Sequence, residues 1–236
     1  MTKNAQEDHA MRYQNITKGI FLARPNRFIA HVLVDGETVV CHVKNTGRCA
    51  ELLRPGVPVY LEKAQNPARK TAFDLIAVEK GDLLINMDAQ APNRVFAEWA
   101  AEGKFLPEVQ VIQPEYRYGD SRLDFVLTTP QGLHLVEVKG VTLEENGHAR
   151  FPDAPTERGV RHLGELERAA AAGLAATAFF VIQMEGMKDF APNDATHPAF
   201  GEALRHAAAN GVRVEAWECA VTPESLRIVR PVKTLL

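Results

Sequence analysis

The sequence has few cysteines and no pattern that would pair them. Only Cys41, Cys49 and Cys219 occur among 236 residues. An odd count argues against a disulfide framework. Cys41 and Cys49 also lack the close CxxC spacing that is typical of a structural zinc site. We therefore expect free, buried thiols and a fold that needs no covalent cross-links, since a chain of this length can bury a sizeable core.

Long apolar segments are also absent. The longest run is "AAAAGLAATAFFVI" (169–182), which is divided by Gly173 and is shorter than the ~20 residues of a membrane-spanning helix. It is typical of a helix end followed by a buried strand. The first residues, "MTKNAQEDHAMRYQNITKGIF", contain no apolar core of a signal peptide. We expect a cytoplasmic protein without a membrane partner.

The chain has no excess of positive charge, because its formal net charge is −3. As a whole it is therefore not a basic nucleic-acid binder. The charge is unevenly distributed, however: residues 1–70 contain 11 Lys and Arg against 6 Asp and Glu, and the remainder contains 16 against 24. This asymmetry indicates a basic binding part joined to an acidic part.

Short β segments dominate the first part of the chain. Alternating apolar residues and turn signals predict strands at 27–34, 38–43, 57–64, 72–79 and 83–87. Five short strands with little helical pattern favour a small barrel or sandwich, with an OB-like barrel as one candidate. "DAQAPN" (88–93) marks a boundary, so we expect domains at 1–88 and 89–236.

The second part alternates helices and strands. We predict helices at 93–103 and 156–173, capped by Asn93 and Thr156, and a third helix at 197–211. Strands are predicted at 108–117, 121–129, 133–139, 176–184 and 212–218. The tight turns "YGD" and "PQG" imply that the first three strands form an antiparallel meander. The fold class is therefore α+β or α/β, with the order αβββαβ at its centre.

A possible catalytic constellation lies on two strands of this meander. Asp124, Glu137 and Lys139 form the pattern D-x12-E-x-K, and a hairpin would bring Asp124 beside Glu137. Two neighbouring carboxylates make an oxygen site suited to Mg²⁺ or Mn²⁺, and a lysine on the same face can stabilise charge on a phosphate. The alternative is an edge-strand ion pair. The αβββαβ order resembles the restriction-endonuclease-like PD-(D/E)XK core, which favours a nuclease site.

Further residues are candidates for the same site. Glu98 on the first helix and Glu115 on the first meander strand are possible metal ligands, with solvated surface carboxylates as the alternative. His162 can assist proton transfer or contact DNA. Arg158 and Arg161 near the helix start can meet phosphates. For His162 the alternative is a role in packing.

Basic residues of the first part could form a groove for nucleic acid. Such a groove would follow a phosphate backbone, with Phe28 and Tyr60 available to stack on bases. A mildly basic, solvated surface is the alternative. The candidate residues are Arg24, Arg27, Lys44, Asn45, Thr46, Arg48, Arg69 and Lys70.

Several segments resemble the sugar fermentation stimulation protein (SfsA) family. They are "VKNTGR", "NPARK", "SRLDF", "VEVKGVTL", "FPDAPTERGVRHLGEL" and "NGVRVEAW", and the similarity runs from about Phe21 to Val229. The resemblance implies an OB-like domain joined to a PD-(D/E)XK nuclease-like domain. It also implies DNA binding and a part in regulating sugar (maltose) utilisation.

The resemblance carries over to particular residues. It implies that Asp124, Glu137 and Lys139 occupy the nuclease motif positions, and that Asn45 and Thr46 belong to the family's "PNTG" turn. Four positions depart from the family pattern: Lys44 replaces the proline of that turn, Arg48 and Cys49 replace a small residue and a methionine, and Arg161 replaces a lysine.

These observations leave three hypotheses. The first is a Mg²⁺-dependent nuclease that binds DNA with weak sequence specificity. The second is a DNA-binding regulator that keeps the fold without catalysis. The third is a small-molecule or sugar-phosphate binding protein. The sequence does not decide between single- and double-stranded DNA.

Overall fold

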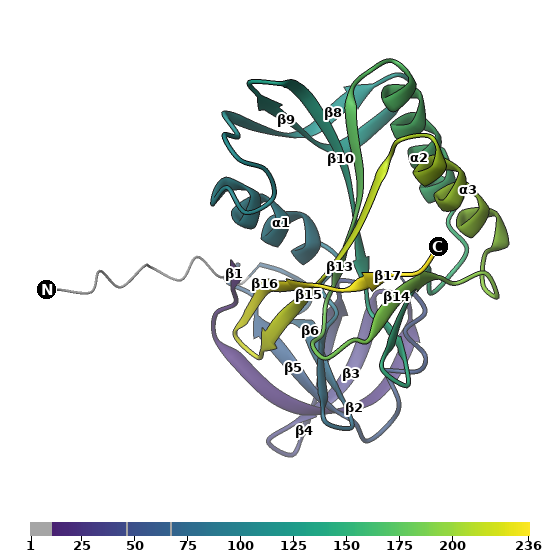
Figure 1. Cartoon of the computed structure of the whole chain (residues 1–236). Coiled ribbons are helices and arrows are strands. Elements are labelled where there is room, and N and C mark those ends of the chain that lie inside the picture. The colour runs from purple at the N-terminus through teal and green to yellow at the C-terminus, as the bar shows by residue number, and fades with distance from the viewer. Residues whose placement is uncertain (1–10, 46, 67) are drawn as a thin grey trace, which may run out of the picture.

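A β-barrel and a mixed α/β domain make up the molecule, for which we use a computed structural model (Figure 1). The structure describes residues 11–45, 47–66 and 68–236. The barrel occupies the lower part of the view, and the helices and the large sheet occupy the upper part. The predicted fold class, an OB-like barrel followed by a restriction-endonuclease-like domain, is confirmed.

The barrel is a six-stranded sheet in the order β4-β3-β2-β5-β6-β7, closed by a further pairing of β4 with β6. Its apolar interior includes Phe21, Val32, Leu61 and Leu75. The predicted strands all exist, with small shifts of their ends. The bounds are β2 Ile16–Asn26, β3 Ile29–Val34, β4 Glu37–Val43, β5 Pro58–Lys63, β6 Phe73–Lys80 and β7 Leu83–Asn86.

Strand β2 is the barrel strand that the sequence interpretation missed. It contains Gly19 and Pro25, which usually mark turns, and these residues hid its length. Gly19 has a packing reason: a Cβ there would lie 2.6 Å from Val32 Cγ1 and 2.9 Å from the Leu33 carbonyl oxygen. The glycine therefore allows β3 to approach β2 closely enough to close the barrel.

The second domain is built on a seven-stranded sheet in the order β1-β16-β15-β13-β10-β9-β8. The predicted antiparallel meander of β8, β9 and β10 is present, and β10, β13 and β15 run parallel. The bounds are β1 Met11–Arg12, β8 Val111–Tyr118, β9 Ser121–Thr129, β10 Gly132–Val141, β13 Ala175–Ile182, β15 Arg213–Thr222 and β16 Ser225–Pro231.

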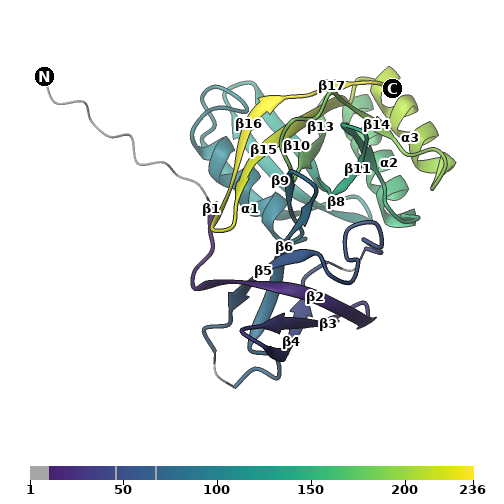
Figure 2. The ribbon, with the colours of Figure 1, turned by 90° about the horizontal axis from the view of Figure 1, so that it is seen from below.

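Helices cover both faces of this sheet (Figures 1 and 2). Helix α1 (Ala91–Ala101) packs Phe96 and Trp99 on one face, and α2 (Glu157–Ala171) packs Leu163 and Leu166 on the other, beside α3 (Pro198–Ala209). The Thr156 hydroxyl caps α2 by accepting a hydrogen bond from the Gly159 backbone N–H at 3.1 Å, as predicted.

The predicted cap of α1 was wrong. The N-cap position is Gln90, and Asn93 lies inside the first turn. Pro92 at the second helical position is consistent with this earlier start, because a proline in the first turn leaves no helical hydrogen bond unmade. The Asn93 side chain is therefore available for a contact elsewhere.

Two further features were not expected from the sequence. A small sheet contains β11 (Leu143–Glu145), β12 (His148–Phe151), β14 (Asp189–Pro192) and β17 (Lys233–Thr234). In addition, β1 pairs with β16, so residues 11–12 belong to the large sheet and not to the barrel that follows them. Along the described ranges, none of the helices has both the length and the apolar character needed to cross a membrane.

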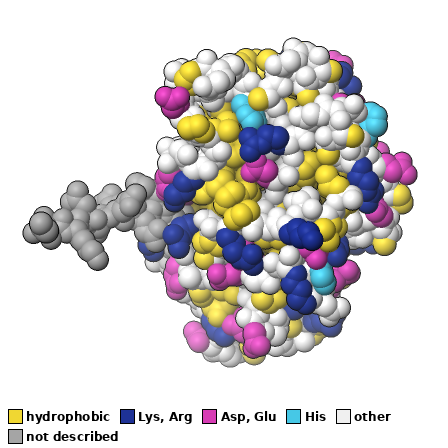
Figure 3. Space-filling model, viewed as in Figure 1, with side chains coloured by type: hydrophobic (Ala, Val, Ile, Leu, Met, Phe, Trp, Pro, Cys, Tyr) yellow, Lys and Arg dark blue, Asp and Glu magenta, His cyan; other side chains and the backbone are white. Residues whose placement is uncertain are grey.

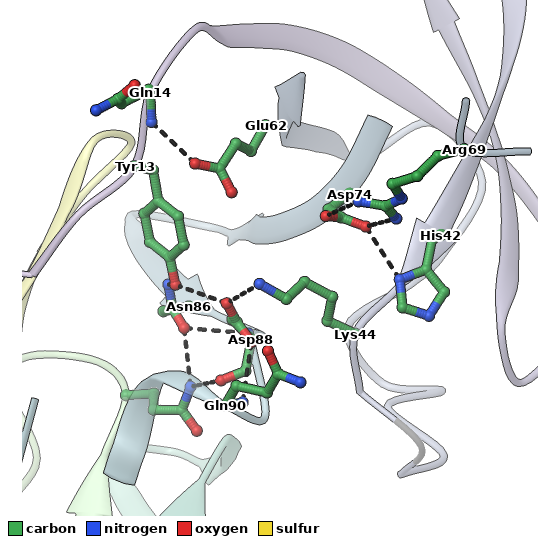
Figure 4. Close-up of polar contacts among 11 residues, drawn as sticks. Tyr13, Gln14, His42, Lys44, Glu62, Arg69, Asp74, Asn86, Asp88 and Gln90 are labelled. Carbon is green, nitrogen blue, oxygen red and sulfur yellow. Dashed lines mark hydrogen bonds and ion pairs between the residues drawn. The ribbon is translucent and has the colours of Figure 1, made fainter. Parts of the chain in front are cut away.

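A buried polar network connects the two domains (Figure 4). The Asn86 amide donates to the Tyr13 hydroxyl at 2.9 Å, and the Gln183 amide donates to Asn86 Oδ1 at 2.8 Å. Lys44 from the barrel donates to Asp88 Oδ2 at 2.5 Å. We call Tyr13, Lys44, Asn86, Asp88 and Gln183 the junction network, because it holds the barrel against the end of the large sheet.

Candidate active site and nucleic-acid interface

Asp124 and Glu137 lie where strands β9 and β10 separate. The regular pairing of these strands ends at Val136 and Phe125, one residue before the two acids. Beyond that point the Val138 backbone N–H donates to Asp124 Oδ2 at 2.8 Å. The predicted proximity of the two acids is consistent with this register, because Asp124 and Glu137 are the next residues on each strand.

Glu137 is buried, and its two carboxylate oxygens differ in their hydrogen bonds. Its Oε1 accepts hydrogen bonds from Lys139 Nζ and from His162 Nδ1. Its Oε2 is buried and has no hydrogen-bond partner among the described residues. A buried carboxylate oxygen without a partner costs free energy unless a ligand or ion compensates it.

His162 is bonded at both ring nitrogens. Arg158 Nε donates to His162 Nε2 at 3.3 Å, so Nε2 is the acceptor and Nδ1 carries the proton that is donated to Glu137. Arg158, His162 and Glu137 thus form a chain from the surface to the buried acid. Arg158 and His162 are four residues apart on α2 and therefore lie on the same face of the helix.

The two acids differ in their electrostatic surroundings. Burial raises the pKa of Asp124, and the negative charge of Glu137 adds to this. Burial acts in the same direction on Glu137, but the hydrogen bond from His162 and the charge of Lys139 outweigh it, so that the pKa of Glu137 is lowered. Neighbouring acids with pKa values pushed apart are common in active sites.

Asn93 is a site residue that the sequence interpretation assigned to a different role. Its side-chain amide donates to Asp124 Oδ1 at 2.9 Å. With Val138 on the other oxygen, both oxygens of Asp124 are fixed in direction. No local sequence pattern indicates this contact, because it joins α1 to a strand residue 31 positions further along the chain.

The donor set fits a divalent cation only in part. Asp124 and Glu137 supply oxygen ligands, and the unpartnered Oε2 of Glu137 suits a cation. Within the described ranges, however, no group of three or more His, Cys, Asp or Glu side chains could hold a metal ion. Mg²⁺ keeps several water ligands and often binds through one or two carboxylates, so this pair is compatible with Mg²⁺.

The other predicted metal ligands have different contacts. Glu98 Oε1 accepts a hydrogen bond from Arg94 at 3.0 Å, one turn earlier on α1. Glu115 is exposed, has a positive φ of 54°, and forms an ion pair with Arg122 at 3.4 Å. The structure therefore does not bring Glu98 or Glu115 into a cluster with Asp124 and Glu137.

Several of the basic residues that were predicted to bind nucleic acid are bonded to other groups of the protein. Arg24 donates to four backbone carbonyls, those of Arg27, Asn45, Gly47 and Arg48, and so holds these residues together. The cations nearer the junction are paired with acids: Lys44 with Asp88, and Arg69 with Asp74. These cations have partners that a phosphate would have to displace.

The remaining predicted basic residues lie at the surface. Arg48, Lys70, Arg158 and Arg161 are exposed, and the Arg27 guanidinium lies 4.7 Å from the centre of the Phe28 ring. Asn45 accepts a hydrogen bond from the Gly47 backbone N–H at 2.8 Å, as expected for a turn. Thr46 lies outside the described residues.

Basic side chains gather across the middle of the face seen in Figure 3. The band lies at the level where the barrel meets the second domain. The negative net charge of the chain therefore does not exclude a local surface for a polyanion.

Fold and site together define a protein in which an OB barrel precedes a restriction-endonuclease-like domain with an Asp, Glu and Lys site. Two family models match the chain: "SfsA N-terminal OB domain" at residues 22–87 and "Sugar fermentation stimulation protein RE domain" at residues 90–225. The chain belongs to the sugar fermentation stimulation protein family.

Relatives match over nearly their whole length. The chain is 56% identical over 216 residues to a sugar fermentation stimulation protein homolog of Desulfitobacterium hafniense (strain Y51), covering 92% of this chain and 94% of the relative. It is 51% identical to the homolog of Ruminiclostridium cellulolyticum, covering 96% and 100%. A solved structure, Pyrococcus furiosus SfsA in complex with Ca²⁺, matches with a TM-score of 0.88 at 27% identity, covering 96% of this chain and 99% of that one.

Proposed function

We propose that this protein is a Mg²⁺- or Mn²⁺-dependent nuclease that binds DNA with weak sequence specificity. The observation that carries the proposal is the buried Glu137, whose Oε2 has no partner among the described residues while Lys139 and His162 hold its Oε1. Buried oxygens without a partner also occur at Glu51 and Glu98, but Glu137 is the one of these three acids whose charge raises the pKa of Asp124, the other acid of the predicted motif. The proposal includes action in the cytoplasm, on the DNA of the cell.

Each residue then has a distinct task. Asp124 and Glu137 would hold the cation, which when bound polarises a phosphodiester and lowers the pKa of a water molecule. Lys139, on the same strand face as Glu137, places positive charge where negative charge develops on the phosphate. His162 keeps Oε1 of Glu137 in a fixed direction and is itself oriented by Arg158. Asn93 does the same for Asp124.

The Ca²⁺ in the related Pyrococcus structure supports a divalent cation in this family. The alternative function, a non-catalytic DNA-binding regulator of sugar utilisation, is favoured by a different observation. Lys139 donates to Glu137, and the described residues supply no third acidic ligand. A site of this kind could retain a cation or phosphate without cleaving DNA.

A cleavage assay distinguishes the two functions. Supercoiled, linear and single-stranded DNA would be incubated with Mg²⁺ or Mn²⁺, and binding to the same DNA would be recorded by gel shift. Wild type would be compared with Lys139→Ala and with Lys104→Ala, which removes a half-exposed lysine paired with Glu102 in the same domain. We expect cleavage by wild type and Lys104→Ala, and loss of cleavage in Lys139→Ala.

Two other outcomes are informative. DNA binding without cleavage in wild type would favour the regulator. Cleavage that persists in Lys139→Ala and in Asp124→Asn would show that the reaction does not use this site. Binding should weaken steeply with salt under either DNA-binding function, since contacts with phosphates release counterions.

A further inference from the structure

A pocket on the barrel, next to the junction network, has no role in the proposed chemistry. Its volume is about 320 Å³, within the range of small-ligand sites. We call it the barrel pocket. Its lining includes Phe28, His42, Lys44, Arg69, Asp74 and Gln90.

The charges of the barrel pocket are internally compensated. Arg69 donates to both oxygens of Asp74, at 2.8 and 2.6 Å, and His42 Nδ1 lies 3.0 Å from the same carboxylate. Lys44 is bonded to Asp88. Figure 4 shows His42 and Arg69 both directed at Asp74, and Lys44 directed at Asp88. A phosphate would therefore find each cation already beside an acid, so the pocket favours an uncharged group.

One wall of the barrel pocket is an exposed aromatic ring. Phe28 is 44% exposed, and the Arg27 guanidinium lies over its ring. Polar groups of the lining can form hydrogen bonds: the Gln90 amide, and the His42 Nε2, which is not the ring nitrogen that contacts Asp74. A flat apolar face combined with donors and acceptors matches the chemistry of a nucleobase.

The barrel pocket shares a lining residue, Gln90, with a groove beside the candidate active site. Gln90 also lines a second, open groove of about 580 Å³, together with Asn93, Pro114 and Phe125. Asn93 is the residue that donates to Asp124. A strand with one base in the barrel pocket would therefore follow the first turn of α1 towards the two carboxylates.

We propose that the barrel pocket binds an unpaired nucleobase, stacked on Phe28, and that the preferred substrate of the site is therefore single-stranded. The preference for a single-stranded substrate rests on the proposed nuclease function, whereas the binding of a base in the barrel pocket does not. Bases inside a duplex have both faces covered by their neighbours, so duplex DNA offers nothing that this pocket can hold. An unpaired base of any type has a free face that can stack on an aromatic ring, which agrees with weak sequence specificity.

The test measures affinity with EDTA present, so that no cleavage occurs. The probes are a short oligothymidylate, an abasic oligonucleotide of the same length, and a duplex of the same length. The variants are Phe28→Ala and the matched control Val40→Ala, which removes a 46% exposed side chain from the same barrel. Thermal unfolding of both variants would confirm that the barrel is intact.

We expect the oligothymidylate to bind more tightly than the abasic strand and the duplex. Phe28→Ala should weaken its binding about 5- to 150-fold, the range of one lost base–aromatic stack. Val40→Ala should change no affinity, and Phe28→Ala should leave abasic binding unchanged. Equal binding of abasic and base-containing strands would mean that phosphates alone are recognised, and would overturn the proposal. Equal effects of the two variants would do the same.

The two proposals fail separately. If duplex DNA is cleaved in a Lys139-dependent way but Phe28→Ala behaves like Val40→Ala, the barrel pocket assignment is wrong and the nuclease remains. If Phe28-dependent binding of single strands occurs without cleavage by wild type, the pocket remains and the nuclease is wrong.

Discussion

Replacing Lys44 by methionine tests the structural role of this lysine where the barrel meets the large sheet. Its ammonium bonds Asp88, and the side chains of the pair are 18% and 2% exposed. Removing one partner of a buried pair costs about 3–5 kcal/mol. Asp88 keeps a contact with the Tyr13 hydroxyl and the Gln90 backbone N–H, and water reaches part of Lys44. We therefore expect Lys44→Met to lower the free energy of unfolding by about 2–4 kcal/mol, below the full cost of an unpaired buried charge.

Lys18→Met is the matched control. Lys18 is 54% exposed and pairs with Glu79 on the same barrel, and exposed pairs contribute about 0.2–1 kcal/mol. Urea unfolding would be followed by circular dichroism for the whole chain and by fluorescence of Trp99 and Trp217, which lie in the second domain. If both variants lose the same small free energy, Lys44 does not hold Asp88 in solution and the reasoning is refuted.

The remaining predictions concern the reactivity of the thiols and the loss of unfolding free energy at acid pH. Burial raises the pKa of Cys41 and of Cys49 to about 12, so we expect the three cysteines to react with a thiol reagent such as dithionitrobenzoate only after unfolding in urea; rapid reaction of the native protein would contradict this. Burial also raises the pKa of Asp189, but hydrogen bonds from Arg150 and His148 outweigh it and lower the pKa. The stability from Asp189 is therefore present above its unfolded pKa of about 4 and is lost as pH falls through the lower folded value. Unfolding free energies between pH 7 and pH 3 should fall more steeply for wild type than for Asp189→Asn, and parallel curves would rule the effect out.

Much of the fold was predictable because the core strands alternate clearly. The meander of β8, β9 and β10 was visible from its apolar spacing and tight turns, and the helix that begins after Thr156 was visible from its cap. Strand β2 could not be predicted from its sequence, because Gly19 and Pro25 are residue types that are typical of turns. The strands of the small sheet are too short to show a period.

The sequence predicted only those residues of the candidate site that lie close together along the chain. Glu137 and Lys139 are two residues apart on one strand, and Asp124 is on the strand that a short hairpin pairs with it. Asn93 reaches the site from α1, and no local pattern indicates such a contact.

The partners of the basic residues could not be predicted at all. The sequence shows that Arg24 and Arg69 are cations, but not that backbone carbonyls hold the first and Asp74 holds the second. Charge counts report how many cations exist, whereas binding depends on which of them lack an internal acceptor.

The pairing of β1 with β16 makes the barrel an insertion between two pieces of the second domain. The chain leaves the large sheet after Arg12, forms the barrel, and returns at α1. Two covalent links therefore tether the barrel instead of one. Two covalent links restrict the motion of the barrel relative to the sheet more than a single link would. A fragment that begins after Arg12 would lose one tether and would also leave the edge of β16 unpaired, where another chain could add.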